Sequence, residues 1–170
     1  MTWTAVSAFT DGQVVTHTIM NQLAANIDHL RSPNIYTAFA VAELTTTSAS
    51  FVSMGGAYEQ AAFATTGGPL LVLLTGMVRV TGSASEIGRF DIEVDGSRVG
   101  HSTGGLMAIQ RETNAGSVTG TPPYAAVIGR IITGLSVGNH SIKMMWNVDS
   151  GGTLRIGHSG SAIRFYVKEL

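Results

Sequence analysis

Residues 89–98 read Arg-Phe-Asp-Ile-Glu-Val-Asp-Gly-Ser-Arg, and this stretch decides the fold class. Its first half alternates apolar and charged residues, and a period of two indicates a strand with one face toward a core. The dipeptide Asp95-Gly96 follows at once, and between two strands it is the strongest short signal for a hairpin turn. The stretch therefore predicts antiparallel β-structure.

The same patterns continue on both sides of this hairpin. The segment 163–168 alternates in the same way, Leu70–Leu74 is a short apolar run typical of a buried strand, and the 21 glycines suit many tight turns. Many short strands joined by Gly-rich turns predict an all-β, jelly-roll-like antiparallel sandwich. The expected strands are Ile35–Ala42, Ser50–Met54, Ala61–Thr65, Leu70–Thr81, Arg89–Val94, Arg98–Met107, Ala125–Ile132, His140–Val148, Thr153–Gly157 and Ala162–Lys168.

The N-terminal part follows a different pattern. Residues 1–15 are expected to form an extended arm with apolar anchors that include Trp3 and Phe9. Thr16 can cap a helix through its hydroxyl, and Ser32-Pro33 ends it because the residue before proline avoids the helical region. We therefore expect an arm and anchoring helix over 1–33 and a β-sandwich domain over 34–170.

The expected helix carries an apolar stripe. Ile19, Leu23, Ile27 and Leu30 are spaced four, four and three residues apart, which places them on one face. A lone helix of roughly 15 residues is marginal in water and needs a partner. The stripe therefore predicts attachment or oligomerisation, either in a bundle with sister helices or against a neighbouring protein.

Composition favours self-association. Charged residues make up 12% of the chain, against about 25% in typical soluble domains. Because interface cores are depleted of charge, this predicts a homo-oligomer, with a sticky monomeric domain as the alternative. The net charge is −1 and the cations are scattered, so a nucleic-acid partner is not expected. No apolar run reaches membrane-spanning length, and no export signal is visible, so synthesis in a cytoplasm is expected.

The acidic residues of the deciding stretch resemble the start of a calcium loop. Asp91, Glu93 and Asp95 precede Gly96, but the position that needs a bidentate glutamate is Ser102. The favoured interpretation is a solvent-facing strand edge that leads into the hairpin. No metal or other cofactor is therefore expected.

The remaining polar residues give no catalytic pattern. The five histidines are spread along the chain and are best interpreted as surface or interface residues, with a threefold ring around an ion as the alternative. No serine lies in a G-x-S-x-G elbow, the nearest stretch being 157–160, and no pair of carboxylates is singled out. We therefore predict that the chain is not an enzyme.

Recognition of a ligand is expected at an exposed loop. Residues 114–123 are rich in Gly, Ser, Thr and Pro, and binding often lies in loops on a rigid sandwich. Asn114, Thr121 and Tyr124 are the candidate contacts, whereas Trp146 alternates with apolar neighbours and is expected in the core.

Two stretches resemble the structural proteins of tailed-bacteriophage virions, namely fibre, spike, minor tail and head-decoration proteins. These chains begin with a tryptophan, a G-x-V-V-T entry and an L-N-x-x-x-x-x-N-I/L helix, and Met20-Asn21 departs mildly from that pattern. The matching N-terminal residues are Trp3-Thr4, Phe9, Asp11–Thr16, Met20–Leu23, Asn26-Ile27 and Leu30. The ending resembles the closing strands of fibre and spike domains through Gly134-Leu135, Gly138–Ile142, Trp146, Gly151–Thr153 and Val167–Leu170.

The resemblance implies a homotrimeric β-sandwich that is attached to other virion proteins by its arm and helix. The expected function is host-surface recognition by a tail fibre, spike or minor tail protein, with a host surface glycan as ligand. The alternative is a capsid decoration or head-fibre protein that stabilises the shell, and a polysaccharide hydrolase is a third class. The expected location is the virion, assembled in the host cytoplasm.

Overall fold

The computed structural model describes residues 16–31, 35–82, 86–110, 123–157 and 160–170, with side chains of the helix described as far as Ala24. One helix, α1 (His17–Arg31), precedes twelve strands and a short 3-10 turn at Gly56–Tyr58. The helix has the bounds that the sequence predicts, and the Thr16 hydroxyl accepts a hydrogen bond from the Ile19 amide at 3.4 Å. The predicted cap is therefore confirmed.

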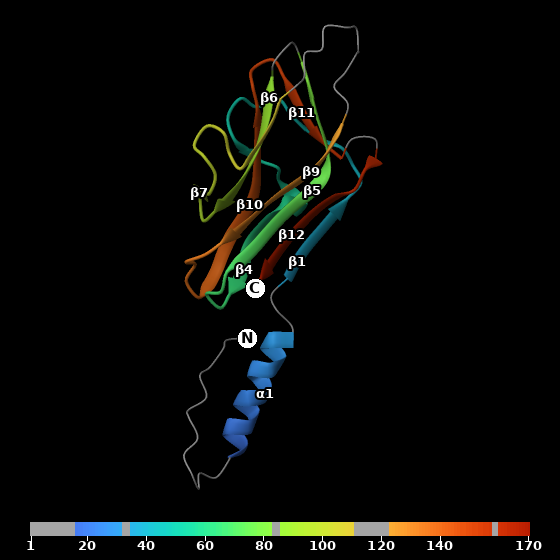
Figure 1. The fold of residues 1–170 in the computed structure, drawn as a ribbon. Helices are drawn as coiled ribbons and strands as arrows, with labels where there is room; N and C mark the ends of the chain where they lie inside the picture. Colours follow the sequence, from blue (N-terminus) through green and yellow to red (C-terminus); the bar gives the residue numbers. More distant parts are fainter. Residues whose placement is uncertain (1–15, 32–34, 83–85, 111–122, 158–159) are drawn as a thin grey trace.

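The strands form two antiparallel sheets that pack face to face (Figure 1). Sheet A contains β1 (Ile35–Ala40), β2 (Leu44–Thr46), β5 (Leu70–Thr81), β9 (Tyr124–Ile132), β11 (Thr153–Ile156) and β12 (Ile163–Glu169). Sheet B contains β3 (Val52–Ser53), β4 (Glu59–Thr65), β6 (Ile87–Val94), β7 (Ser97–Arg98), β8 (Met107–Gln110) and β10 (Gly138–Val148).

The strand order is that of a jelly roll. Four strands are interrupted. β3 and β4 lie end to end along β10, β7 and β8 along β6, and β11 and β12 along β5, while β1 and β2 lie along β12 and β11. Counted as eight strands, sheet A has the order 1-8-3-6 and sheet B the order 2-7-4-5. Such a pair of interleaved Greek keys defines the double-sheet jelly roll. The predicted fold class is confirmed.

The core lies between the sheets and contains the alternate residues that the sequence pattern assigns to it. Phe90, Phe165 and Trp146 are among its largest members, and each is at most 4% exposed. The run Leu70–Leu74 is a strand, but only its first, third and fifth residues reach the core. Leu71 and Leu73 lie half-buried on the outer face of sheet A.

The Asp95-Gly96 turn is confirmed, whereas the strand predicted after it is wrong. Both turn residues have positive φ, 50° and 80°, as a two-residue hairpin of this type requires. The strand predicted over Arg98–Met107 stops at Arg98, and residues 99–106 instead fold as a loop over sheet B. Gly105, with φ 65°, turns the chain there, where a Cβ would lie 2.5 Å from the Phe90 carbonyl oxygen.

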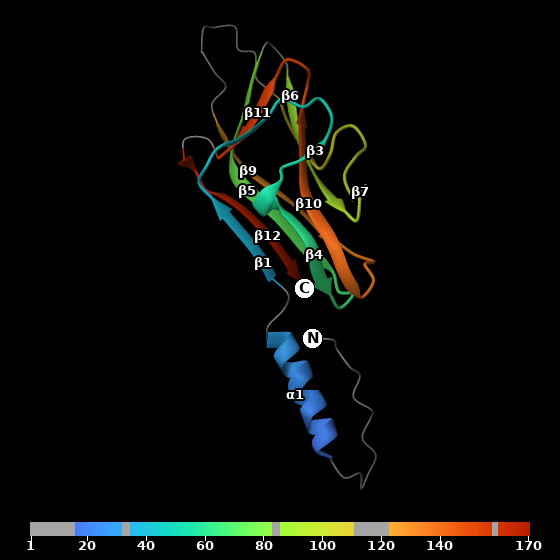
Figure 2. The same cartoon turned by 180° about the vertical axis from the view of Figure 1, so that it is seen from behind.

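The helix and the chain's last strand lie at the same end of the sandwich. Figures 1 and 2 show α1 beyond the end at which β1 begins and the C-terminus lies. The register agrees, because Ile35 at the start of β1 pairs with Lys168 near the end of β12. A partner that binds α1 would therefore lie at this end of the jelly roll.

Candidate functional site

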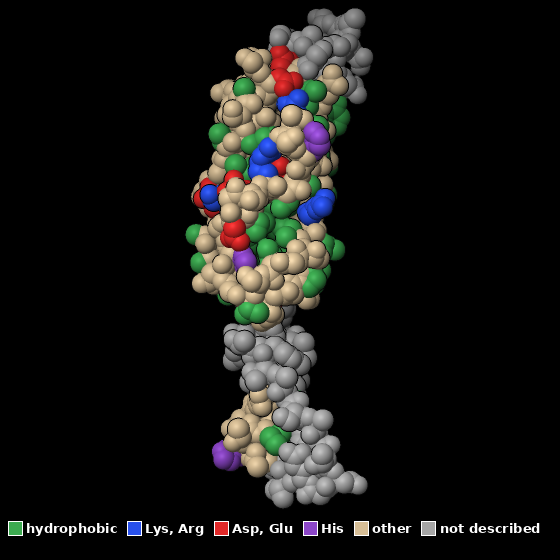
Figure 3. All heavy atoms as spheres, turned by 90° about the vertical axis from the view of Figure 1, so that its left-hand side faces the viewer, with side chains coloured by type: hydrophobic (Ala, Val, Ile, Leu, Met, Phe, Trp, Pro, Cys, Tyr) green, Lys and Arg blue, Asp and Glu red, His purple; other side chains and the backbone are tan. Residues whose placement is uncertain are grey.

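A polar cleft lies on the outer face of sheet B. Residues 99–106 fold over this face, residues 47–51 border it along β10, and a hollow of about 560 Å³ remains between them. Figure 3 views this face and shows cationic and anionic side chains next to one another in its middle. The cleft is lined by Ala49, Ser50, Phe51, Arg89, Arg98, Ser102, Thr103 and Asn147.

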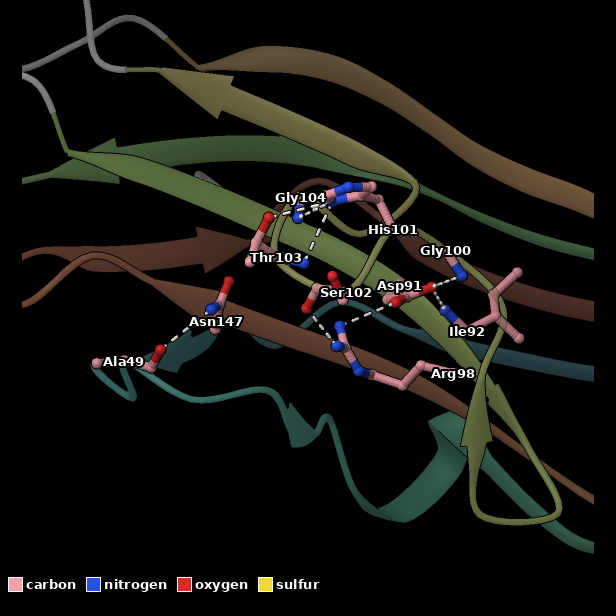
Figure 4. A network of polar contacts seen from close by, with 10 residues as sticks. All are labelled: Ala49, Asp91, Ile92, Arg98, Gly100, His101, Ser102, Thr103, Gly104 and Asn147. Carbon is pink, nitrogen blue, oxygen red and sulfur yellow. Dashed lines mark hydrogen bonds and ion pairs between the residues drawn. The ribbon is translucent and has the colours of Figure 1, made fainter.

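Asp91 of β6 holds one wall of the cleft. Its side chain is fully buried, accepts hydrogen bonds from the Gly100 amide at 2.9 Å and the Ile92 amide at 2.8 Å, and pairs with Arg98 at 3.1 Å (Figure 4). Arg98 also donates to the Ser102 carbonyl oxygen. Asp91 therefore fixes the first part of the 99–106 loop to the sheet, and Arg98 links this carboxylate to the middle of the loop.

His101 closes the tip of the same loop. Its Nδ1 accepts hydrogen bonds from the backbone amides of Thr103 at 3.3 Å and Gly104 at 3.2 Å. The Thr103 hydroxyl lies 3.1 Å from the same nitrogen. Because two amides can only donate, Nδ1 carries no proton in this arrangement. The loop that bears Ser102 and Thr103 thus has a defined shape.

Asn147 of β10 forms part of the floor. Its Nδ2 donates to the Ala49 carbonyl oxygen at 3.1 Å, which fixes the orientation of the amide because a carbonyl cannot donate. The other end, Oδ1, is buried and has no hydrogen-bond partner within the described residues. In Figure 4 this oxygen points into the space on the Thr103 side.

Both cations of the cleft are already neutralised. Arg89 pairs with Asp149 at 2.6 Å, and this hydrogen bond lowers the pKa of the Asp149 carboxyl below its usual value. Arg98 pairs with Asp91 and also lies 4.0 Å above the centre of the Phe51 ring, a cation–π contact. The cleft therefore offers fixed hydrogen-bonding groups without net charge.

The three carboxylates of the predicted strand edge all have protein partners. The prediction that this edge faces solvent is wrong for Asp91, which the 99–106 loop covers. Glu93 pairs with Lys143 at 3.3 Å, and Asp95 pairs with His140 at 2.6 Å. Within the described ranges no group of three potential ligands is arranged to hold a metal ion.

His140 is not the surface residue that the sequence suggests. It is 7% exposed, and its ring nitrogens contact Asp95 Oδ2 at 2.6 Å and the Ser136 carbonyl oxygen at 2.9 Å. An ionised carboxylate and a carbonyl only accept hydrogen bonds, so both nitrogens donate and the ring is cationic. In agreement, the hydrogen bond to Asp95 raises the pKa of His140. Asp95 follows β6 and His140 lies at the start of β10, 45 residues later, so no local sequence pattern predicts this pair.

The predicted attachment residues are only partly described. Ile19 is half-buried and Leu23 is 42% exposed, while Trp3, Phe9 and the side chains of Ile27 and Leu30 lie outside the described part. Of the predicted receptor loop, Asn114 and Thr121 also lie outside it. Tyr124 is described: it is half-buried, begins β9 and pairs with Val78 in sheet A. The structure therefore does not bring Tyr124 to the cleft of sheet B.

Sequence reasoning missed the cleft, because its residues come from three separate stretches of the chain. Serine, threonine, arginine and asparagine at 49–51, 89–103 and 147 form no motif. The one available signal was the cluster of glycines at 100, 104 and 105, which is typical of a loop. The α1 helix, the only α-helix among the described residues, is too short and too polar to cross a membrane.

The sequence matches no protein-family model and no curated protein. Solved structures with a similar fold include a chain of the infectious bursal disease virus Gx strain, with 12% identity and a TM-score of 0.42 over 81% of this chain and 38% of that one. Another is the VP2 subviral particle of the same virus, with 11% identity and a TM-score of 0.43 over 80% of this chain and 37% of that one. This chain thus spans little more than a third of the length of those proteins.

Proposed function

We propose that this chain is a non-enzymatic structural protein of a tailed-phage virion that is attached by its N-terminal arm and helix. The observation that carries the proposal is the combination of the N-terminal signature with a helix that leaves Met20 and Leu23 exposed. Within α1, Met20 is 53% exposed and Leu23 is 42% exposed. A 15-residue helix of this kind needs an external partner, and other virion proteins or sister helices provide one.

The jelly roll is the part that the virion exposes, and we propose that it recognises the host surface as a tail fibre, spike or minor tail protein. A rigid double sheet is suited to this role, because it carries loops in fixed positions. The polar cleft on sheet B is described above and gives one such fixed surface. A fold alone does not decide function, so the proposal depends mainly on the N-terminal arm and α1.

The outer face of sheet A supports a homo-oligomer. Neighbouring strands β5 and β9 present Leu71, Leu73, Val127 and Ile131 around Gly129, and Val127 and Ile131 are 70% and 56% exposed. We call this group the β5–β9 face. Isolated apolar residues on a surface need no explanation, but a contiguous group is typical of an interface. We propose that a second copy of the chain covers it.

Charge favours a ring over a symmetric pair. The cations at the surface of sheet A are Arg79, Arg130, Arg155, Arg164 and Lys168, and among the described residues only Arg155 has an ion pair, with Glu43 at 2.6 Å. Two sheet A faces brought together would oppose like charges. A head-to-tail ring places sheet A against a different surface of the next copy and avoids this. A trimer is the ring that the family resemblance implies.

Antibody labelling of intact particles in the electron microscope tests the location. We expect label at the tail or its tip. Label spread over the head would instead identify a capsid decoration or head-fibre protein, and particle stability against heating would then rise with its occupancy. No label on purified particles would overturn the virion assignment.

Deletion of residues 1–32 tests the attachment role. The truncated chain should retain its β-sheet circular dichroism and fail to join particles, because the arm and α1 are absent. The intact chain, added at the same concentration, is the control. Incorporation of the truncated chain at the level of the intact one would contradict the proposal.

A further inference from the structure

We propose that the polar cleft on sheet B binds a neutral saccharide. The inference rests on the host-recognition part of the proposed function and assigns it to a defined site, away from Tyr124. The cleft volume of about 560 Å³ lies within the range of small-molecule sites, roughly 300–1,000 Å³. The acceptor, the donors and the charge of the cleft together select the class of ligand.

The acceptor is Asn147 Oδ1. The amide is 7% exposed and is held by its hydrogen bond to Ala49, so Oδ1 keeps its direction. A buried carbonyl oxygen without a partner costs about 1–3 kcal/mol, and a ligand hydroxyl can satisfy it once the cleft is filled. A ligand that only accepts hydrogen bonds, such as a sulfate ion, cannot do this.

The donors are the two guanidinium groups and two hydroxyls. Each guanidinium has five N–H groups. Arg89 uses two of them, toward Asp149 and the Ile87 carbonyl oxygen, and Arg98 uses two, toward Asp91 and the Ser102 carbonyl oxygen. Ser102 and Thr103 add exposed hydroxyls on the loop wall. A sugar hydroxyl that donates to Asn147 can accept from one of these groups at the same time. A polyol has several such hydroxyls, which makes saccharides the matching class.

Charge selects neutral saccharides over acidic ones. Asp149 and Asp91 neutralise the two arginines, and neither carboxylate lines the cleft. A uronate or phosphate would therefore gain no net Coulombic attraction and would lose its hydration. Phe51 is covered by Arg98, so stacking of a sugar on this ring is not part of the proposal.

The walls of the cleft are formed before any ligand arrives. Asp91 and His101 fix the 99–106 loop, and the Ser48 carbonyl oxygen accepts a hydrogen bond from the Val148 amide at 2.9 Å, which fixes the opposite wall. A preformed site avoids the entropy cost of ordering its loops on binding. Weak saccharide contacts can therefore give measurable affinity.

The test is a chemical-shift titration of the purified full-length chain. The probes are methyl glycosides of glucose, galactose, mannose and N-acetylglucosamine, with glucuronate and inorganic phosphate as charged comparisons. We expect at least one neutral glycoside to shift the amide signals of Ser102, Thr103 and Asn147. Shifts caused by none of the glycosides, or larger shifts caused by glucuronate or phosphate, would overturn the proposal.

A double variant, Ser102→Ala with Thr103→Val, separates binding from fold. Both side chains are exposed, and the Arg98 contact uses the Ser102 backbone. Loss of the Thr103 hydroxyl removes one contact to His101 Nδ1 but leaves the two backbone amides that donate to it. The chain should therefore fold normally and bind at least tenfold more weakly. Ser97→Ala, which changes an exposed hydroxyl on β7, is the matched control and should bind unchanged. Unchanged affinity in the double variant would contradict the site. Because the assay uses no particles, its failure would leave the virion assignment standing.

Discussion

The two sheets bury the same kinds of residue inward and present very different surfaces outward. On sheet B the outward-facing charges find partners within the chain, as Arg89 does with Asp149 and Lys143 with Glu93, and two loops cover part of the face. On sheet A the β5–β9 face is bare and largely apolar, with Arg130 beside it, and Val127 is 70% exposed. The outer face of sheet B is partly covered and its charges are paired by residues of the same chain, whereas the β5–β9 face of sheet A is left exposed.

This difference indicates that the two outer faces are suited to different kinds of partner. A surface whose polar groups are fixed by internal contacts can bind a small polar ligand without rearrangement. A bare apolar surface gains most from a large partner, because burial is worth roughly 25 cal/mol per Å². We therefore assign ligand recognition to sheet B and self-association to sheet A. The predictions below test each assignment separately.

The largest expected effect comes from Asp91→Ala, which removes the residue that fixes the loop on sheet B. The variant leaves the Arg98 charge and two backbone amides without their acceptor, so the free energy of unfolding should fall by about 3 kcal/mol. Urea denaturation followed by tryptophan fluorescence measures this.

Glu93→Ala on the same strand is the control for Asp91→Ala. Its partner Lys143 is 36% exposed and can turn to water, so the loss should stay below about 1 kcal/mol. Equal losses in the two variants would show that the 99–106 loop does not depend on Asp91. The contrast between sheet B and sheet A would then lose its structural basis.

The second prediction concerns the β5–β9 face. The double variant Val127→Asp with Ile131→Asp should leave the free energy of unfolding of the monomer within about 0.5 kcal/mol, because both residues are exposed. It should weaken self-association by about 100-fold, because two desolvated carboxylates would replace apolar contacts. Light scattering coupled to gel filtration measures the mass over a range of concentrations.

Thr37→Asp on β1 is the control for that double variant, because it adds a charge to the same sheet away from the β5–β9 face. We expect it to keep the mass of the intact chain. A mass equal to one chain for the unaltered protein at every concentration would contradict self-association itself. If the double variant were still a trimer, the interface would have to lie on a surface other than the β5–β9 face.

The sequence predicts the internal face of each strand better than the external one. Alternation identified Phe90, Phe165 and Trp146 as core residues because burial repeats every second position, and the Asp95-Gly96 turn is local. The three residues of β2 are too few to show a period, and this strand was missed. The predicted strand over Arg98–Met107 failed because Asp91, nine residues before Gly100, fixes a loop there.

The candidate site depends on contacts between distant parts of the chain, so the sequence could not predict it. Asn147 meets Ala49 across 98 residues, and Arg89 meets Asp149 across 60. Neither pair has a spacing that belongs to a motif. The N-terminal signature, in contrast, is contiguous, and a contiguous pattern can be recognised before the fold is known.

The smallest expected effect concerns the His140–Asp95 pair, which joins the start of β10 to the β6–β7 turn on sheet B. The hydrogen bond to Asp95 raises the pKa of His140 above 6.5, and the same bond lowers the pKa of Asp95 below 3.8. The histidine contribution to stability is therefore complete below pH 6.5 and is lost as the pH rises through the raised pKa. The aspartate contribution is complete above pH 3.8 and is lost as the pH falls through the lowered pKa.

Between these limits the pair should stabilise the fold by about 1 kcal/mol, the value of one hydrogen bond. Urea unfolding at pH 5 and pH 9 should show a loss at the higher pH for the unaltered chain. His140→Gln should flatten that difference, because glutamine does not titrate. Ser97→Ala on the neighbouring β7 should keep it, since the change is at an exposed residue and involves no titratable group. If His140→Gln kept the full difference, the titrating group would lie elsewhere, and the pair would not hold the start of β10 against the β6–β7 turn.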